Sequence, residues 1–364
     1  MKGVILVENS FVHPYMPNSV TENKKAMLDE LGINSVEDIY KSIIPDELLY
    51  KERLDIPEPI RSEYELKRHV IGILNRDITT EEYTSFLGAG CYKHQVPAIC
   101  DEINSRGEFL TAYCGDTYSD HGKMQAIFEY TSMMGELLDT DVVSYTTYDG
   151  GQAVASSLRM AVRAVREKGM DGKVILVPKT MNPEIYSQVV QYCRNVAEVR
   201  KIAYEPETGL MDLEELKEQL AKKNVAAVFF ENPTYLGNFE TRGEEIAKLA
   251  HDAGAYCVVQ TEVAALGIME SPVNQGADIV CGDIQPLGMH IQFGGGQAGF
   301  IACNQNMDLV EQFPTYMYGI TETEKEDTYG WGRAMNYRSS HGSRENAKEY
   351  FGTETGLWAI TAGG

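Results

Sequence analysis

The sequence is short of basic residues: 32 lysines and arginines stand against 54 aspartates and glutamates, which leaves a formal net charge of −22. A surface with this much negative charge repels the phosphates of nucleic acids and the anionic head groups of lipids. We therefore expect neither a nucleic-acid partner nor a membrane partner.

Long apolar runs are also missing. A membrane-spanning helix needs about 20 consecutive apolar residues, and the N-terminal MKGVILVENS reaches a glutamate after a few apolar positions, unlike a signal peptide. The seven cysteines include no C-x-x-C pair, which argues against a zinc site and against a disulfide framework. We expect a cytoplasmic protein with buried, unreactive thiols and no metal site.

The overall composition is that of a folded protein. Hydrophobic residues make up 43% of the chain and charged residues 24%, close to the average of soluble domains. At roughly 150 residues per domain, 364 residues suffice for two domains. We assign residues 1–80 to a helical N-terminal arm, 81–312 to a large α/β domain, and 313–364 to a linker and the start of a C-terminal small domain.

The arm is predicted to contain short helices separated by proline and glycine. One runs over 21–31 and stops at Gly32, and Ser35 caps a second before Pro45. Ser62 followed by Glu65 has the spacing of a capping box and opens a third helix. The arm is too thin to hold a core alone, so we expect it to pack on the rest of the chain or on a partner.

From about residue 140, apolar runs of strand length alternate with helical periodicity. The predicted strands are 173–178, 225–230, 255–259, 277–281 and 298–302, and the predicted helices are 151–167, 183–195, 212–223 and 243–253. This β-α-β-α order predicts a mainly parallel sheet covered on both faces. Functional sites of such sheets lie beyond the carboxyl ends of the strands.

One glycine motif has the wrong context for a cofactor site. Gly294, Gly296 and Gly299 fit G-x-G-x-x-G, but in a dinucleotide site that turn follows a strand and opens a helix. Here it precedes the predicted strand AGFIA. We interpret it as a tight turn between two strands and not as an NAD site.

A second glycine motif opens an amphipathic helix. Gly150 and Gly151 stand at its start, where backbone N–H groups can hold an anion. Pyridoxal-phosphate enzymes of the aminotransferase-like fold place their phosphate at this point. However, Asp149 would crowd a phosphate there. Gly150 and Gly151 are therefore weak candidates for an anion site, and a structural helix start is the alternative.

A glycine-containing loop at 86–94 carries several reactive side chains. A cysteine, a histidine and a lysine together could supply a nucleophile and a base, but the sequence shows no third residue at a spacing that would orient them. We therefore predict that the loop faces a shared cavity and does not catalyse a reaction alone. The cavity candidates are Gly88, Gly90, Cys91, His94, Tyr113 and His121.

Seven motifs, in order, resemble subunit 1 of glycine dehydrogenase (decarboxylating), the P-protein of the glycine cleavage system. They are FLGAGCYKHQVPAI, FLTAY, MQAIFEYTSMMGELLDTDV, YDGGQAVA, ENPTYLGNFE, GADIVCGDIQPLG and FGGGQAGF. The resemblance implies an aminotransferase-like (fold type I) α/β domain that assembles with a second subunit. In that family the pair decarboxylates glycine on pyridoxal phosphate and passes the aminomethyl group to the lipoyl arm of the H-protein.

The lysine that such chemistry requires is missing from this chain. Pyridoxal phosphate forms an imine with a lysine, which the fold supplies just after the strand predicted at 277–281. The chain has no lysine between Lys248 and Lys325, and Gln285 stands at the expected place. After the strand at 255–259, Gln260, Thr261 and Glu262 stand where an aspartate is expected on the pyridine nitrogen. The resemblance therefore implies that the partner, subunit 2, carries the lysine and the cofactor, and that this chain is inactive alone.

Two departures from the family leave alternatives open. The segment 114–121 lacks the family's Tyr-Gln-Pro-Glu run, and the chain ends where a further small α/β domain would begin, so we expect that domain to be incomplete. One alternative is a non-catalytic scaffold or degenerate relic of the subunit. The other, an autonomous pyridoxal-phosphate lyase or aminotransferase, lacks its lysine.

Overall fold

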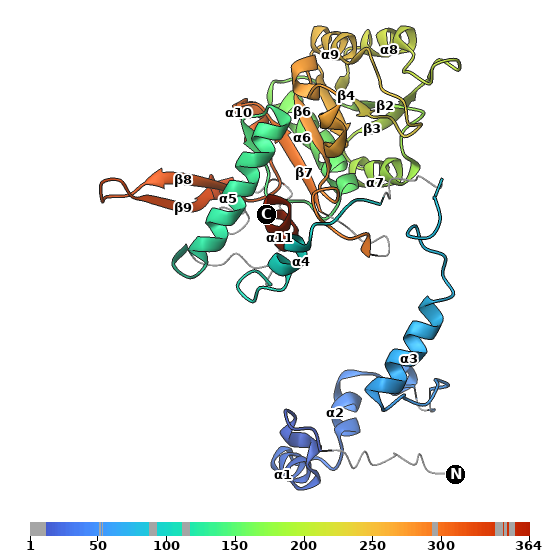
Figure 1. The fold of residues 1–364 in the computed structure, drawn as a ribbon, viewed down its shortest axis with the longest axis vertical. Coiled ribbons are helices and arrows are strands. Elements are labelled where there is room, and N and C mark those ends of the chain that lie inside the picture. The colour runs from blue at the N-terminus through green and yellow to red at the C-terminus, as the bar shows by residue number, and fades with distance from the viewer. Residues whose placement is uncertain are drawn as a thin grey trace. The chain divides into compact units, whose positions relative to one another are not determined.

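The structure, a computed structural model, describes residues 12–50, 52, 54–86, 93–110, 117–292, 298–338, 345, 348 and 354–364. It divides into two compact units, Met1–Tyr83 and Thr84–Gly364 (Figure 1).

The first unit is made of short helices whose ends follow their sequence signals. Its elements are η1 (Pro17–Ser19), α1 (Thr21–Leu31), α2 (Val36–Ile43), η2 (Asp46–Leu48) and α3 (Glu63–Leu74). Gly32 ends α1 in the left-handed conformation, with φ of 66°. Ser35 caps α2, and the Ser62 hydroxyl accepts the Glu65 N–H at the start of α3. All three predicted helices are confirmed. None of the described residues of this unit is buried, so these helices share no core.

The second unit is built on a seven-stranded sheet with the order β1-β7-β6-β5-β4-β2-β3. Its strands are β1 (Val142–Val143), β2 (Val174–Pro178), β3 (Glu198–Ile202), β4 (Val225–Asn232), β5 (Tyr256–Thr261), β6 (Ile279–Asp283) and β7 (Gly299–Cys303). Neighbours from β3 to β6 are parallel, and β7 is antiparallel to both of its neighbours. The five predicted strands and the mainly parallel sheet are confirmed. Strand β3 has no apolar run and was not predicted.

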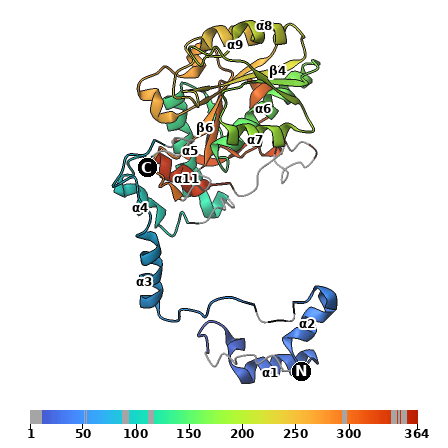
Figure 2. The same ribbon diagram turned by 90° about the vertical axis from the view of Figure 1, so that its right-hand side faces the viewer.

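Helices cover both faces of this sheet and create two cores (Figure 2). One face carries α6 (Gly150–Glu167), α7 (Pro183–Cys193) and α10 (Met307–Val310), and the other carries α5 (Thr117–Leu138), α8 (Leu213–Leu220) and α9 (Gly243–Asp252). Strand β4 is buried along its whole length, which explains its unbroken apolar run. The α/β alternation leaves the carboxyl ends of β2, β4, β5 and β6 on one edge of the sheet.

Several smaller elements complete the second unit. They are α4 (Ala98–Asn104), η3 (Val263–Gly267), η4 (Pro272–Gln275), the hairpin strands β8 (Met317–Glu322) and β9 (Tyr329–Ala334), η6 (Asn336–Arg338) and α11 (Gly356–Gly363). The hairpin, which was not predicted, projects from the body of the unit and packs at its base on α5 (Figure 1). Among the described helices, none is both long and apolar enough to cross a membrane.

Candidate functional site

The candidate site lies where the carboxyl ends of β5 and β6 meet the N-terminus of α6. Strand β6 ends at Asp283, and β5 runs parallel to it and ends just before Glu262. The Gly150 N–H donates a hydrogen bond to Asp283 Oδ2 at 3.3 Å. A Cβ atom at Gly150 would lie 3.1 Å from Asp283 Cβ, so glycine permits this close approach of helix and strand.

Two N–H groups of the first turn of α6, those of Gly150 and Gln152, donate to side chains of the chain itself. Asp149 Oδ1 accepts the Gln152 N–H at 2.6 Å and caps the helix. The Gln152 side chain in turn accepts the Tyr148 N–H at 2.8 Å and donates to the Tyr192 hydroxyl at 3.0 Å. A Cβ atom at Gly151 would lie 2.7 Å from the Gln188 side chain. The two glycines of the predicted anion site thus face protein groups.

Burial raises the pKa of Asp283 to about 7, and the nearby carboxylates of Asp149 and Glu262 act in the same direction. The N–H groups of Gln285 and Gly150 oppose this shift, because both donate to the carboxylate. The pKa of Glu262 is also raised by burial, against the effects of the Ala264 N–H and of His94. The site therefore concentrates carboxyl groups at one end of the sheet.

Gln285 takes part in the local turn that follows β6. Its N–H donates to Asp283 Oδ1 at 2.7 Å, and its side-chain Nε2 donates to the Met289 carbonyl at 2.8 Å. The side chain is thus tied to its own loop. Gln285 has no amine, and it stands where the sequence analysis expected the imine-forming lysine of the fold.

The profile of the glycine cleavage system P-protein family matches residues 13–363. This chain belongs to that family. It is 34% identical over 361 residues to the probable glycine dehydrogenase (decarboxylating) subunit 1 of Staphylothermus marinus, covering 96% of this chain and 74% of that protein. The subunit of the same description from Pyrococcus horikoshii is 36% identical over 350 residues, covering 96% of this chain and 75% of that protein.

Solved structures agree with this membership. A crystal structure of glycine decarboxylase (P-protein) of the glycine cleavage system, in inhibitor-bound form, superposes with a TM-score of 0.79 at 30% identity, covering 97% of this chain and 76% of that one. Sphingosine-1-phosphate lyase of Burkholderia pseudomallei, at 15% identity and a TM-score of 0.51, shares the fold alone. The predicted resemblance and the aminotransferase-like α/β architecture are confirmed.

P-proteins depend on pyridoxal phosphate, but the described residues at this edge of the sheet do not fit the cofactor. It needs an amine for its imine and donors for its phosphate. The turn after β6 presents the amide of Gln285, which is tied to Met289, and the first donor of α6, the Gly150 N–H, is directed at Asp283. At the end of β5, Gln260 Oε1 is buried and accepts no hydrogen bond from the described residues.

Two of the predicted cavity residues, His94 and His121, lie among the described residues, and their surroundings differ. His94 is partly buried and lies close enough to Glu262 to lower its pKa, and its Nε2 finds no hydrogen-bond partner among the described residues. His121 instead accepts the Trp331 N–H at 2.9 Å, with the two rings in an edge contact at 5.5 Å. Gly88, Gly90, Cys91 and Tyr113 lie outside the described residues, as do Gly294 and Gly296.

Two residues of this edge were missed by the sequence analysis. Tyr130 of α5 is fully buried, and burial together with the Asp283 charge raises the pKa of its hydroxyl, which therefore lies near that carboxyl. In the sequence Tyr130 resembles any aromatic core residue of an amphipathic helix. Glu231 is the next-to-last residue of the buried strand β4, and burial raises its pKa to about 7 against a hydrogen bond from the Asn182 N–H. The signal that could have identified it is a charged residue directly after the apolar run VAAVFF.

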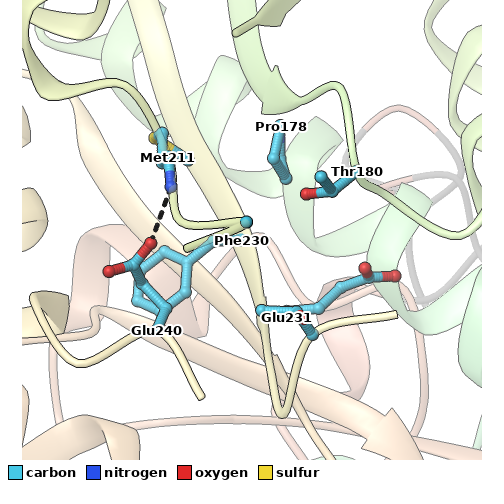
Figure 3. Close-up of a pocket in the computed structure, with 8 residues that line it drawn as sticks. Pro178, Thr180, Met211, Phe230, Glu231 and Glu240 are labelled. Atoms are coloured by element: carbon cyan, nitrogen blue, oxygen red, sulfur yellow. Dashed lines mark hydrogen bonds between the residues drawn. The ribbon is translucent and has the colours of Figure 1, made fainter. Parts of the chain in front are cut away.

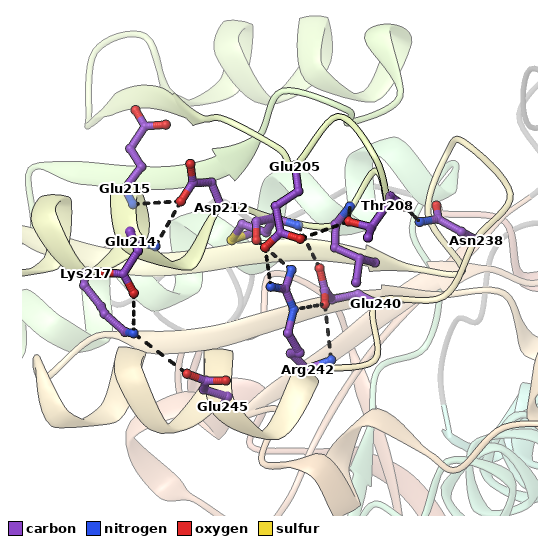
Figure 4. Close-up of polar contacts among 12 residues, drawn as sticks. Glu205, Thr208, Asp212, Glu214, Glu215, Lys217, Asn238, Glu240, Arg242 and Glu245 are labelled. Carbon is purple, nitrogen blue, oxygen red and sulfur yellow. Dashed lines mark hydrogen bonds and ion pairs between the residues drawn. The ribbon is translucent and has the colours of Figure 1, made fainter.

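A hollow beside Glu231 leaves room for about one water molecule. Its lining comes from the carboxyl-terminal ends of β2 and β4 and from the loops after β2, β3 and β4 (Figure 3). It comprises Pro178, Thr180, Gly209, Met211, Phe230, Glu231, Thr234 and Glu240. Arg242 fixes these loops through Glu205 at 2.7 Å, Glu240 at 3.2 Å and the Met211 carbonyl at 2.7 Å (Figure 4). Because these polar groups pair with each other, the hollow is part of the scaffold.

Proposed function

We propose that this chain is the subunit of a glycine decarboxylase P-protein that lacks the imine-forming lysine. It completes the pyridoxal-phosphate site of a lysine-bearing partner, glycine dehydrogenase subunit 2, for decarboxylation of glycine and transfer of the aminomethyl group to the lipoyl H-protein. The observation that carries the proposal is the turn after β6, where Gln285 replaces the lysine and is tied to Met289. Pyridoxal phosphate, bound by the partner, supplies the electron sink for the reaction.

In this proposal the chain contributes positioning and exclusion of water, and no proton transfer is assigned to it. The residues proposed to border the shared cavity are Gly88, Gly90, Cys91, His94, Tyr113 and His121. His94 has the strongest support, because its Nε2 is buried, finds no partner among the described residues and lies near Glu262.

Reconstitution tests the proposal. This chain is mixed with a cognate lysine-bearing subunit and lipoylated H-protein, and glycine-dependent exchange of CO2 is measured, with each protein alone as a control. We expect exchange only when both subunits are present, and none from this chain alone. A stable complex of the two subunits without exchange would instead support the scaffold or relic interpretation.

A variant of the same assay tests the role of His94. His94→Ala should lower the exchange rate about tenfold while the complex still forms, since only a group at the shared cavity is lost. His290→Ala is the matched control, because His290 is exposed and pairs with the exposed Asp101. Equal exchange rates for the two variants would show that His94 does not contribute to the shared cavity.

A further inference from the structure

The N-terminus of α6 is the place in this fold that is best suited to bind an anion. It is the start of an 18-residue helix, its first residues are buried, and it opens toward the carboxyl edge of the sheet. Exposed N–H groups at such a position attract phosphate through hydrogen bonds and through the helix dipole. The question is what this chain places there.

The group nearest to the first N–H of α6 is a carboxyl of the chain itself. Gly150 donates to Asp283 Oδ2 at 3.3 Å, and Asp283 Oδ1 is held on its other side by the Gln285 N–H at 2.7 Å. The carboxyl is thus fixed from two directions, by the helix and by the turn that follows β6. The sequence separation of 133 residues shows that the tertiary fold, not local chain geometry, creates this contact.

The backbone is shaped to bring these groups together. A Cβ atom at Gly150 would lie 3.1 Å from Asp283 Cβ and 3.2 Å from its backbone N, closer than most side chains tolerate. Strand and helix therefore meet closely at Gly150, and a phosphate bound to this N–H would have to displace the Asp283 carboxyl group. Two further carboxyl groups, of Asp149 and Glu262, act on Asp283 and add negative charge at the same point.

We infer that Asp283 serves as a built-in anion that closes the α6 N-terminus of this chain against the phosphate of pyridoxal phosphate and of other phosphate monoesters. The inference deepens the proposed function and rests on it in one respect, because it gives a second reason, independent of the missing lysine, why the cofactor belongs to the partner. Restoring a lysine at position 285 alone would then not make this chain a cofactor-binding subunit.

Inorganic phosphate is the direct probe. It is titrated calorimetrically into the full-length chain at pH 8 and constant ionic strength, and the wild type is compared with Asp283→Ala, Asp283→Asn and the double variant Asp149→Ser/Asp283→Ala. Serine retains the cap of α6 while removing its charge. Asp212→Ser is the matched control, because Asp212 caps α8 in the same way, by accepting the Glu214 and Glu215 N–H groups.

We expect the wild type and Asp212→Ser to show no saturable binding, and the double variant to bind phosphate saturably, at least about tenfold more tightly than the weakest affinity that the titration detects. Asp283→Asn keeps the size of the side chain and guards against misfolding of the alanine variant; it should bind with an intermediate affinity. Circular dichroism verifies that each variant is folded.

Two results would overturn the inference: saturable phosphate binding by the wild type with the affinity of the double variant, or folded Asp283 variants that gain no affinity. Neither result bears on the reconstitution assay, which measures CO2 exchange with the partner present. Failure of the inference and failure of the proposed function are thus seen in different experiments.

Discussion

Glu231 shows what burial does to a single carboxyl group in this protein. Its side chain is 5% exposed, and burial raises its pKa from 4.5 to about 7. The folded state therefore holds a proton that the unfolded chain releases between pH 4.5 and pH 7. The contribution of this group to the free energy of unfolding is fully present below pH 4.5 and is lost as the pH rises through 7.

Glu231→Gln tests this directly. Glutamine keeps an acceptor for the Asn182 N–H but does not ionise, so the variant should match the wild type at pH 4 and exceed its stability at pH 8 by about 3 kcal/mol at most. Urea unfolding at several pH values measures the difference. The control is Glu270→Gln, since Glu270 is exposed. The explanation fails when both variants show the same pH dependence.

Gly282 is the residue whose small size most directly shapes the site. A Cβ atom there would lie 2.3 Å from the Thr261 carbonyl oxygen and 3.0 Å from the Phe300 ring. Because the carbonyl belongs to a neighbouring strand, it cannot move aside easily. Gly282→Ala should therefore lower the free energy of unfolding by about 2–3 kcal/mol.

Gly267→Ala is the matched comparison for Gly282→Ala, because a Cβ atom at Gly267 meets nothing within 4 Å. The two urea midpoints should differ clearly, with only the Gly282 variant shifted. Equal midpoints would mean that β5 and β6 can separate without cost, and that the close packing of this edge does not depend on glycine.

The sequence predicts which type of residue stands at a position better than it predicts which residues lie next to each other in the fold. Gln285 was found because a missing lysine is visible in the sequence itself. The contact between Asp283 and Gly150 was not, since it joins residues 133 positions apart and depends on the order of strands in the sheet. Tyr130 was missed for the same reason, because only the packing of α5 brings its hydroxyl near Asp283.

Among the elements, those with both an apolar run and clear end signals were predicted. Strands β2 and β4 to β7 are buried along most of their length, and α6 to α9 show one apolar face each. The edge strand β3 reads EVRKI and buries only Ile202 fully, so it carries neither signal. The hairpin β8–β9 is rich in glycine and polar residues and depends on α5 for support.

His121 is the residue that links α5 to this hairpin. Two-stranded hairpins are marginal by themselves, and the Trp331 N–H donates to His121 Nε2 at 2.9 Å. His121→Ala removes both this acceptor and the edge contact with the Trp331 ring. We expect amide hydrogens of β8 and β9 to exchange about tenfold faster, in line with the loss of roughly 1–1.5 kcal/mol.

Hydrogen exchange followed by mass spectrometry measures this change, and the central sheet serves as the internal reference. His290→Ala is again a suitable control, because its partner Asp101 lies on α4 and not on the hairpin. Faster exchange in β4 and β5 as well would indicate general destabilisation and contradict a local role for His121.

At the scale of the whole molecule, the two units differ in how they are stabilised. The second has two cores on the faces of its sheet, whereas the described residues of the first include no buried side chain. Helix α3 exposes Leu66, Val70, Ile73 and Leu74 to between 43% and 49%. Apolar side chains exposed to this extent on one helix favour association with another surface. Under the proposed function, that surface belongs to the lysine-bearing subunit.

The arm should therefore become ordered when that subunit binds. In the free chain, amides of α1 to α3 are expected to exchange rapidly, because short helices without a core are marginal in water. On addition of the lysine-bearing subunit, exchange in α3 should slow at least about tenfold, while exchange in β4 stays unchanged. Hydrogen exchange with and without the partner measures both.

Charge and apolar contact can be separated within α3. Leu66→Glu/Val70→Glu and Lys67→Glu each lower the net charge by two, but only the first pair removes apolar surface. If apolar contact holds the arm, the double variant should weaken association by about tenfold or more, and Lys67→Glu should change it little. Equal weakening would assign the interaction to charge, and an unaltered affinity in both would show that the partner binds elsewhere on the chain.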